Sequence, residues 1–249
     1  MLRMIICEMM KLKRSKIVFM SIVGAFAVPF MMMIEAFQTH MEYPERVFTL
    51  SDVYDNGMLY MVLMMNMLIC IAIISFVFSR EYAEQTLKTI LPIPISRGAL
   101  LAAKFVVCII LTILINFVSW IGMFALLGIY HIVNGLSGYG IEQACEWMVP
   151  YIFSGILMLL SVTPIAYLAM KTKGFVAPMV VSAALVMGTA AIINQDWAAI
   201  YPWTIPYLLA KGIIEEKGYP MIVSVGVLMT VALIGIGITF YHFYYEDLQ

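Results

Sequence analysis

Charged side chains are scarce in this chain. Asp, Glu, Lys and Arg together make up 12% of its 249 residues, whereas 63% are hydrophobic, and the mean hydropathy is +0.98. A soluble domain usually contains about 25% charged residues, so this composition excludes an ordinary soluble globular protein. We therefore interpret the chain as an integral membrane protein, with no room for a soluble catalytic domain.

Motifs for nucleotide, metal and redox chemistry are also missing. The sequence contains no GxxxxGK[ST] phosphate-binding loop, so it offers no such site for ATP. His40, His131 and His242 stand apart, without an HExxH motif or a cysteine or carboxylate at ligand spacing. Four scattered cysteines form no recognisable motif. We expect no enzymatic activity, no metal and no cofactor in this chain.

Long apolar runs, by contrast, are plentiful. A helix needs about 20 apolar residues to cross about 30 Å of hydrocarbon, and the alternating pattern of barrel strands is absent. The sequence therefore predicts an all-α, polytopic membrane protein with six transmembrane helices. The six runs cover about residues 17–36, 57–79, 104–130, 147–170, 174–194 and 220–243.

Positive charge is distributed unevenly over the short connections. Eleven of the 14 Lys and Arg residues lie before the first run, between the second and third, or between the fourth and fifth. Only Arg46, Lys211 and Lys217 lie in the connections on the other side. Because such an excess marks the cytoplasmic side, both termini are expected in the cytoplasm.

Residues 1–16 combine apolar side chains at helical spacing with a basic end. Leu2, Ile5, Met9 and Leu12 fall on one face, and the stretch KLKRSK follows. This pattern predicts an amphipathic helix in the inner headgroup region, attracted by anionic lipid. The same charges also act as a topology signal, and the two interpretations are compatible.

A charged segment, REYAEQTLKTILPIPISR, occupies residues 80–97 between the second and third runs. Residues 81–91 favour a helix that Ser79 can cap, and Pro92 ends it because proline cannot donate a backbone N–H. Ser96 can cap the next helix. A short helix held at the membrane surface between two crossings is suited to receiving force from a cytosolic partner.

Three connections join the runs on the external side. Residues 37–56 are acidic and are interpreted as a solvated loop, with a surface for a cationic ligand or an external protein as the alternative. The glycine-rich residues 131–146 predict a flexible loop. Residues 195–219 contain prolines, which divide a segment into half-helices, and aromatic side chains, which settle at the headgroup level. This third connection favours external re-entrant helices before the last span, with an aromatic belt on an ordinary loop as the alternative. Its aromatic residues are Trp197, Tyr201, Trp203 and Tyr207.

Two asparagines, Asn66 and Asn116, fall near the middle of the second and third runs. An amide in hydrocarbon needs a hydrogen-bonding partner, so one interpretation is an interhelical hydrogen bond worth about 0.6–2 kcal/mol. The other interpretation places these asparagines, together with the external aromatic residues, on a substrate path. The sequence leaves both open.

Two places in the chain resemble a known family. One is the opening EMMKLKRSKIVFM, and the other is the segment that follows the second run. With the six runs, they resemble the ABC type-2 exporter permeases, and the opening resembles the bacitracin-export and lantibiotic-immunity branch. The matching residues of the second place are Arg80, Glu81, Tyr82, Thr86, Leu87, Leu91, Pro94, Ser96, Arg97 and Lys104.

The resemblance implies one transmembrane permease domain over residues 1–249. In it, residues 1–16 form an interfacial connecting helix, residues 80–97 a cytoplasmic coupling helix and residues 195–219 a re-entrant segment. It also implies that a homodimer of this chain pairs with two copies of a cytosolic ABC ATPase, which binds the ATP and Mg. The expected contacts with the ATPase are Arg80, Glu81, Tyr82, Glu84, Leu87, Lys88 and Arg97.

By the same resemblance, this protein of the bacterial plasma membrane exports an amphipathic peptide antibiotic, such as bacitracin or a lantibiotic, and confers resistance or self-immunity. Other drugs, lipids or polysaccharide chains are the alternative substrates. A non-transporting scaffold or sensor that recruits an ATPase is the alternative from another functional class.

Overall fold

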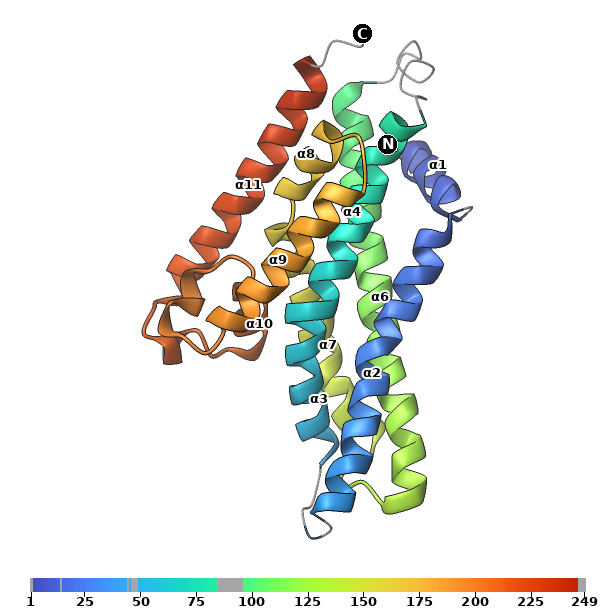
Figure 1. The fold of residues 1–249 in the computed structure, drawn as a ribbon, viewed down its shortest axis with the longest axis vertical. Coiled ribbons are helices and arrows are strands. Elements are labelled where there is room, and N and C mark those ends of the chain that lie inside the picture. Colours follow the sequence, from blue (N-terminus) through green and yellow to red (C-terminus); the bar gives the residue numbers. More distant parts are fainter. Residues whose placement is uncertain (1, 14, 44, 46–48, 85–95, 246–249) are drawn as a thin grey trace.

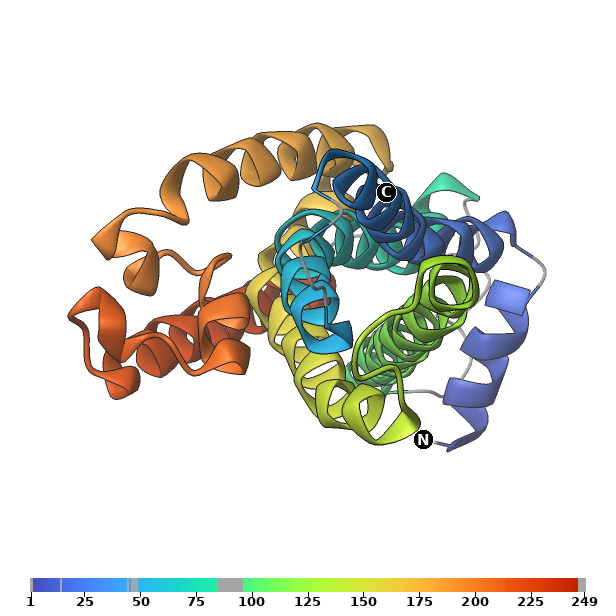
Figure 2. The ribbon, with the colours of Figure 1, turned by 90° about the horizontal axis from the view of Figure 1, so that it is seen from below.

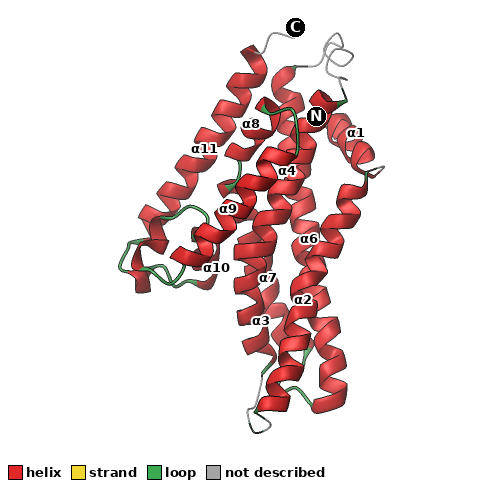
Figure 3. Cartoon of the chain, viewed as in Figure 1, coloured by secondary structure: helices red, strands yellow, loops and turns green. Residues whose placement is uncertain are grey.

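The computed structural model describes residues 2–13, 15–43, 45, 49–84 and 96–245. In these ranges the chain is helical with short connections, and its only bridge of β type joins Thr49 to Ser137 (Figure 3). The all-α expectation is confirmed. The helices are α1 (Leu2–Lys13), α2 (Lys16–Glu42), α3 (Leu50–Tyr60), a π-helix (Met61–Asn66), α4 (Met67–Ala83), α6 (Arg97–Asn134), α7 (Ile141–Ser161), α8 (Pro164–Lys171), α9 (Val176–Ile192), a 3-10 helix (Asp196–Ile200), α10 (Ile205–Lys211), a 3-10 helix (Glu215–Lys217) and α11 (Met221–Tyr245).

Five helical stretches are long and apolar enough to cross a membrane: α2, the continuous stretch Leu50–Ala83, α6, α7 and α11. The expected fifth run is α9, whose 17 residues extend about 25 Å, close to the lower limit for a crossing. The chain is therefore a multi-pass membrane protein with five to six candidate spans. The stretch Leu50–Ala83 lies at the centre, since 72% of its apolar window is buried, against 28% for α2 and 22% for α11.

The long helices stand side by side as one bundle, formed by α2, α3, α4, α6 and α7 (Figure 1). The pair α9 and α11 diverges from this bundle on one side, and α10 lies between their ends (Figures 1 and 2). Helix α1 and the last turn of α11 lie at the same end of the molecule (Figure 1). That placement is the one that an even number of crossings produces.

The fourth expected run, residues 147–170, is not one helix. Helix α7 begins earlier, at Ile141, and ends at Ser161, and α8 starts at Pro164. The break follows from Pro164, which cannot donate a backbone N–H to continue the helix. Helix α11 packs against the break, where a Cβ added to Gly235 would lie 2.5 Å from the Pro164 nitrogen. Close approach of the two helices therefore depends on this glycine.

The expected solvated loop over residues 37–56 is wrong at both ends. Helix α2 continues through Glu42, and α3 starts at Leu50. Thr49 and Asp52 form a capping box in which each side chain accepts a hydrogen bond from the backbone N–H of the other. Asp55 forms an ion pair with Lys211 of α10, with 2.8 Å between the charged atoms. Two of the acidic residues thus begin and anchor a helix.

The expected flexible loop over residues 131–146 is also wrong at both ends. Helix α6 runs through Asn134 and α7 starts at Ile141, which leaves a short turn. Tyr139 in this turn stacks on Phe124 and on His131, with ring centroids 4.7 and 4.6 Å apart. The turn is therefore packed against α6.

Candidate functional site

The coupling segment expected over residues 80–97 is described only at its two ends. Its middle, residues 85–95, lies outside the described residues, so the expected roles of Leu87 and Lys88 stay predictions. On one side, α4 is continuous through Ala83, and Ser79 lies buried inside it rather than at a helix start. The expectation that Ser79 caps a separate helix is wrong. On the other side, the Ser96 hydroxyl accepts a hydrogen bond from the Ala99 N–H at 3.3 Å, so the predicted cap is confirmed.

Four charged side chains meet where these two ends enter the bundle. Lys11 Nζ lies 2.5 Å from Glu8 Oε1 and 2.9 Å from Glu81 Oε1. Lys104 Nζ lies 3.3 Å from Glu81 Oε2 and 3.7 Å from Glu8 Oε2. Glu8 and Lys11 belong to α1, Glu81 to α4 and Lys104 to α6, so three elements converge here. We call these four residues the charge cluster.

The charge cluster is almost closed to solvent. The side chains of Glu8, Glu81 and Lys104 are 7%, 5% and 3% exposed, and that of Lys11 is 35% exposed. Lys104 also donates to the Val77 carbonyl at 2.7 Å. Two positive and two negative charges balance, which offsets the large cost of taking each out of water. The cluster therefore holds α1 against the ends of α4 and α6.

The environment of Lys11 favours its charged form. Burial lowers the pKa of Lys11, but the hydrogen bonds and negative charges of Glu8 and Glu81 outweigh that effect and leave its pKa above the ordinary value. Lys11 is therefore protonated at neutral pH and can hold both carboxylates. This pairing attaches the interfacial helix to α4.

Glu81 does not fit its expected role as a surface contact with an ATPase. Its side chain points into the charge cluster and is buried there. Sequence reasoning missed Lys11 and Lys104 as its partners, and Glu8 as the second carboxylate of the cluster. A signal for Glu8 was present, because it is the only acidic residue in the basic opening and lies one turn before Leu12, the other buried residue of α1.

Two of the expected coupling residues remain accessible beside the cluster. Arg80 donates from Nε to Glu84 Oε1 at 2.8 Å and from a terminal nitrogen to the Lys11 carbonyl at 2.9 Å. Glu84 is the more exposed of the two, with 52% of its side chain in solvent. Tyr82 is half-buried and packs against the core. Arg80 therefore connects α1 to the C-terminal end of α4, next to the segment expected to contact the ATPase.

Arg97 has a different environment from the one expected of a free surface residue. Its guanidinium donates to the carbonyls of Phe243 and Tyr244, at 3.3 and 2.9 Å. These are carbonyls of the last turn of α11, which lack helical partners and favour a cation. Arg97 thus joins the start of α6 to the end of α11.

The two membrane asparagines bind each other. The Asn66 amide donates to Asn116 Oδ1 at 2.8 Å, and the Asn116 amide donates to the Thr112 carbonyl at 2.9 Å. Asn66 and Asn116 are 1% and 0% exposed. The interhelical hydrogen bond is confirmed. Asn66 ends a π-helix, a distortion that is frequent at functional sites, and the expected place of the two asparagines on a substrate path stays a prediction.

The four external aromatic residues do not share one surface. Trp197 is 53% exposed, whereas Tyr207 is 4% exposed. Tyr201 and Trp203 make an edge-to-face contact, with ring centroids 5.0 Å apart. The segment that carries them folds into the short helix α10 and two 3-10 helices, part-way along the bundle (Figure 1). Half-helices are confirmed, and the re-entrant placement stays a prediction.

Comparison with known proteins assigns this arrangement to a family. Residues 4–190 match the family model described as ABC-2 family transporter protein. The chain belongs to the ABC-2 transporter family. All four members of the charge cluster lie inside the matched range. Permease subunits of this family lack a nucleotide-binding domain, and membership implies an ABC ATPase as partner.

This ABC-2 permease is also similar to a curated protein. It is 27% identical, over 208 residues, to the bacitracin transport permease protein BCRB of Bacillus licheniformis, covering 84% of this chain and 98% of that protein. The resemblance to the bacitracin branch is confirmed. No solved structure matches the chain. Among the described residues, no three metal-ligating side chains lie together.

Proposed function

We propose that this chain is the membrane-spanning subunit of an ATP-driven exporter that removes an amphipathic peptide antibiotic, bacitracin-like or a lantibiotic, and so confers resistance or self-immunity. The observation that carries the proposal is the charge cluster. It joins α1 to α4 and α6 at the two points where the segment between them enters the bundle. The similarity to a bacitracin transport permease supports the choice of substrate.

In this proposal, two copies of the chain pair with two copies of an ABC ATPase, which binds the ATP and Mg. Both termini face the cytoplasm of the bacterial cell. The segment over residues 80–97 docks on the ATPase, and nucleotide-driven closure displaces it. Because α1, α4 and α6 are joined by buried ion pairs, they move together, and Arg97 transmits the same displacement to α11.

An antibiotic-susceptibility panel tests the substrate. A sensitive bacterial strain receives this chain alone, its ATPase alone, or both, and the panel includes bacitracin, a lantibiotic and an unrelated ribosome-directed drug. We expect a several-fold rise in the inhibitory concentration of one peptide antibiotic only when both chains are present. Protection against the ribosome-directed drug alone would contradict the proposed substrate class.

ATP hydrolysis in lipid discs tests the transport mechanism. The purified complex is expected to hydrolyse ATP faster when the antibiotic identified by the panel is added. A scaffold or sensor that only recruits an ATPase should show no stimulation. Hydrolysis that does not change with antibiotic would therefore favour the scaffold.

A further inference from the structure

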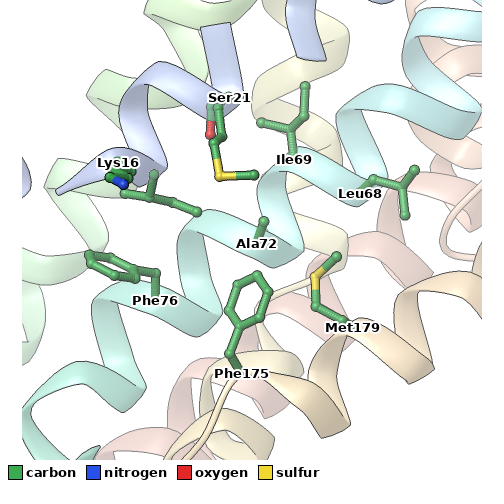
Figure 4. A pocket seen from close by; sticks show the side chains of 10 residues that line it. Lys16, Ser21, Leu68, Ile69, Ala72, Phe76, Phe175 and Met179 are labelled. Carbon is green, nitrogen blue, oxygen red and sulfur yellow. The ribbon is translucent and has the colours of Figure 1, made fainter. Parts of the chain in front are cut away.

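An apolar groove runs between α2, α4 and the start of α9, with a volume of about 470 Å³ (Figure 4). Its walls include Met20, Ala72, Phe76, Phe175 and Met179. The volume falls within the range of about 300–1,000 Å³ that is typical of small-molecule sites. The outer side of the groove is open, since Met20 is 66% exposed and Phe175 is 37% exposed. In a membrane-spanning chain, such a groove opens toward lipid.

The polar groups of the groove lie toward one end. Lys16, the first residue of α2, lies at the edge of the groove (Figure 4), and its ammonium has no ion pair within the described residues. The N-cap residue of α2, Ser15, makes no capping hydrogen bond. Within the described part of the chain, the N–H groups of this first turn therefore lack a side-chain acceptor from the cap, and helix starts of this kind bind anions.

Ser21 gives an independent indication of a ligand. It lines the same groove and is 5% exposed as a residue, its hydroxyl makes no hydrogen bond with any described residue, and the hydroxyl oxygen is not fully enclosed by protein. A hydroxyl on a largely buried residue usually has a partner. An ester or phosphate oxygen reaching into the groove from the Lys16 end would supply one.

A molecule that fits this arrangement has an anionic head and at least one apolar chain. We propose that the groove binds an anionic phospholipid, with an acyl chain against Phe76, Phe175 and Met179 and the phosphate held by Lys16 and the start of α2. Basic residues at the cytoplasmic ends of membrane helices bind such headgroups. The inference rests on the proposed function only in that it places the Lys16 end at the cytoplasmic leaflet. The bound lipid would tie α2 to α4 and α9.

Native mass spectrometry of the purified full-length chain in detergent tests this site. Phosphatidylglycerol and phosphatidylcholine with identical acyl chains are titrated separately, and the bound fraction of each is measured. We expect tighter binding of phosphatidylglycerol by about fivefold or more, because one lysine near an anionic headgroup contributes about 1 kcal/mol. Equal binding of the two lipids would overturn the proposal.

Matched variants separate the groove from general surface charge. Lys16→Gln should remove most of the preference for phosphatidylglycerol, whereas Lys13→Gln, an exposed lysine that does not line the groove, should retain it. Ala72→Trp should fill the groove and weaken the binding of both lipids. Ala72→Leu replaces it if thermal unfolding shows that the larger side chain prevents folding. Equal effects of Lys16→Gln and Lys13→Gln would contradict the site, as would unchanged binding in the filled variant.

The same variants test what else could cover the groove. If a second copy of the chain covered it, Ala72→Trp would change the oligomeric state in size-exclusion chromatography, and that result would also overturn the lipid site. Binding is measured without ATPase or antibiotic. A negative result therefore leaves the export function standing, and loss of export with intact lipid binding counts against the export function alone.

Discussion

At the scale of single residues, all four side chains of the charge cluster are needed to balance its charge. Each lysine pairs with both glutamates, so removing one side chain leaves an uncompensated charge in a site that is nearly closed to water. Such a loss is more costly than the loss of a surface ion pair, which contributes about 0–1 kcal/mol. The cluster is therefore the place where a charge-neutralising substitution should act most strongly.

Substitution of Lys104 tests whether the charge cluster contributes more to stability than a surface ion pair does. Lys104→Met should lower the free energy of unfolding by about 3–5 kcal/mol, because it leaves two buried carboxylates, Glu8 and Glu81, with Lys11 as their one counter-charge in the cluster. The double variant Glu81→Leu with Lys104→Met should cost less than the sum of the single changes, by about 0.5–3 kcal/mol. Unfolding in detergent micelles measures both. Lys13→Met is the control, since it removes an exposed lysine, and a similar effect of Lys13→Met and Lys104→Met would refute the prediction.

The pKa of Lys11 predicts an alkaline limit for the attachment of α1. A group whose pKa is raised by folding stabilises the protein fully below its unfolded value, 10.5 here, and this contribution disappears as the pH rises through the folded pKa. The difference in melting temperature between the wild type and Lys11→Met should thus stay constant from pH 7 to about 10 and shrink only at higher pH. A difference that already declines between pH 7 and 9 would contradict this assignment.

At the scale of elements, the break between α7 and α8 is matched by a glycine on α11. A Cβ on Gly235 would lie 2.6 Å from the Thr163 hydroxyl as well as 2.5 Å from the Pro164 nitrogen. The Pro164 nitrogen belongs to the backbone, and the Thr163 hydroxyl is held by hydrogen bonds to the Leu160 and Ala232 carbonyls. The contact between α11 and α8 is therefore specified by the absence of a side chain at one position.

Gly235→Ala should consequently destabilise the protein by about 1–3 kcal/mol, because the new methyl group forces the two helices apart. Gly237 of the same helix provides a matched control, since a Cβ there meets no atom within 4 Å. Gly237→Ala should be neutral or stabilising by up to about 1 kcal/mol, as expected for alanine in a helix. Thermal unfolding of the two variants in detergent should give shifts of opposite sign or clearly different size.

The same scale shows what sequence reasoning could resolve. The all-helical, multi-pass character and the Ser96 cap depend on neighbouring residues alone, and the structure confirms them, whereas the fourth apolar run is broken at Pro164 and the fifth is short. The start of α3 could also be predicted, because Thr49 and Asp52 have the spacing of a capping box. The acidic composition of this stretch favoured a loop instead. The pairing of Glu8 with Lys104 depends on how α1 folds back onto the bundle, which no local pattern encodes.

At the scale of the whole molecule, most of the ionic contacts between the described helices gather at one end of the bundle. The charge cluster, Arg80 and Arg97 all lie at the end of the bundle that holds α1, the C-terminal ends of α4 and α11, and the start of α6. In the proposed exporter, the segment between α4 and α6 therefore acts on four elements at once. Charges on this segment should affect communication with the ATPase more than they affect folding.

Reversal of two charges tests this communication. Glu84→Lys combined with Lys88→Glu should abolish stimulation of ATP hydrolysis by the antibiotic and reduce resistance, while basal hydrolysis persists. The control reverses Glu216 and Lys217, which lie in the segment expected on the external side. Normal antibiotic stimulation in the Glu84 and Lys88 variant would argue against docking of this segment on the ATPase.

The hydrogen bonds from Arg97 to the final turn of α11 have a practical consequence. Tyr245, one residue beyond that turn's bonded carbonyls, is 69% exposed and can carry a fluorophore. Because Arg97 binds the backbone there, a dye at this position should report, in the proposed exporter, any movement that reaches α11 from the start of α6.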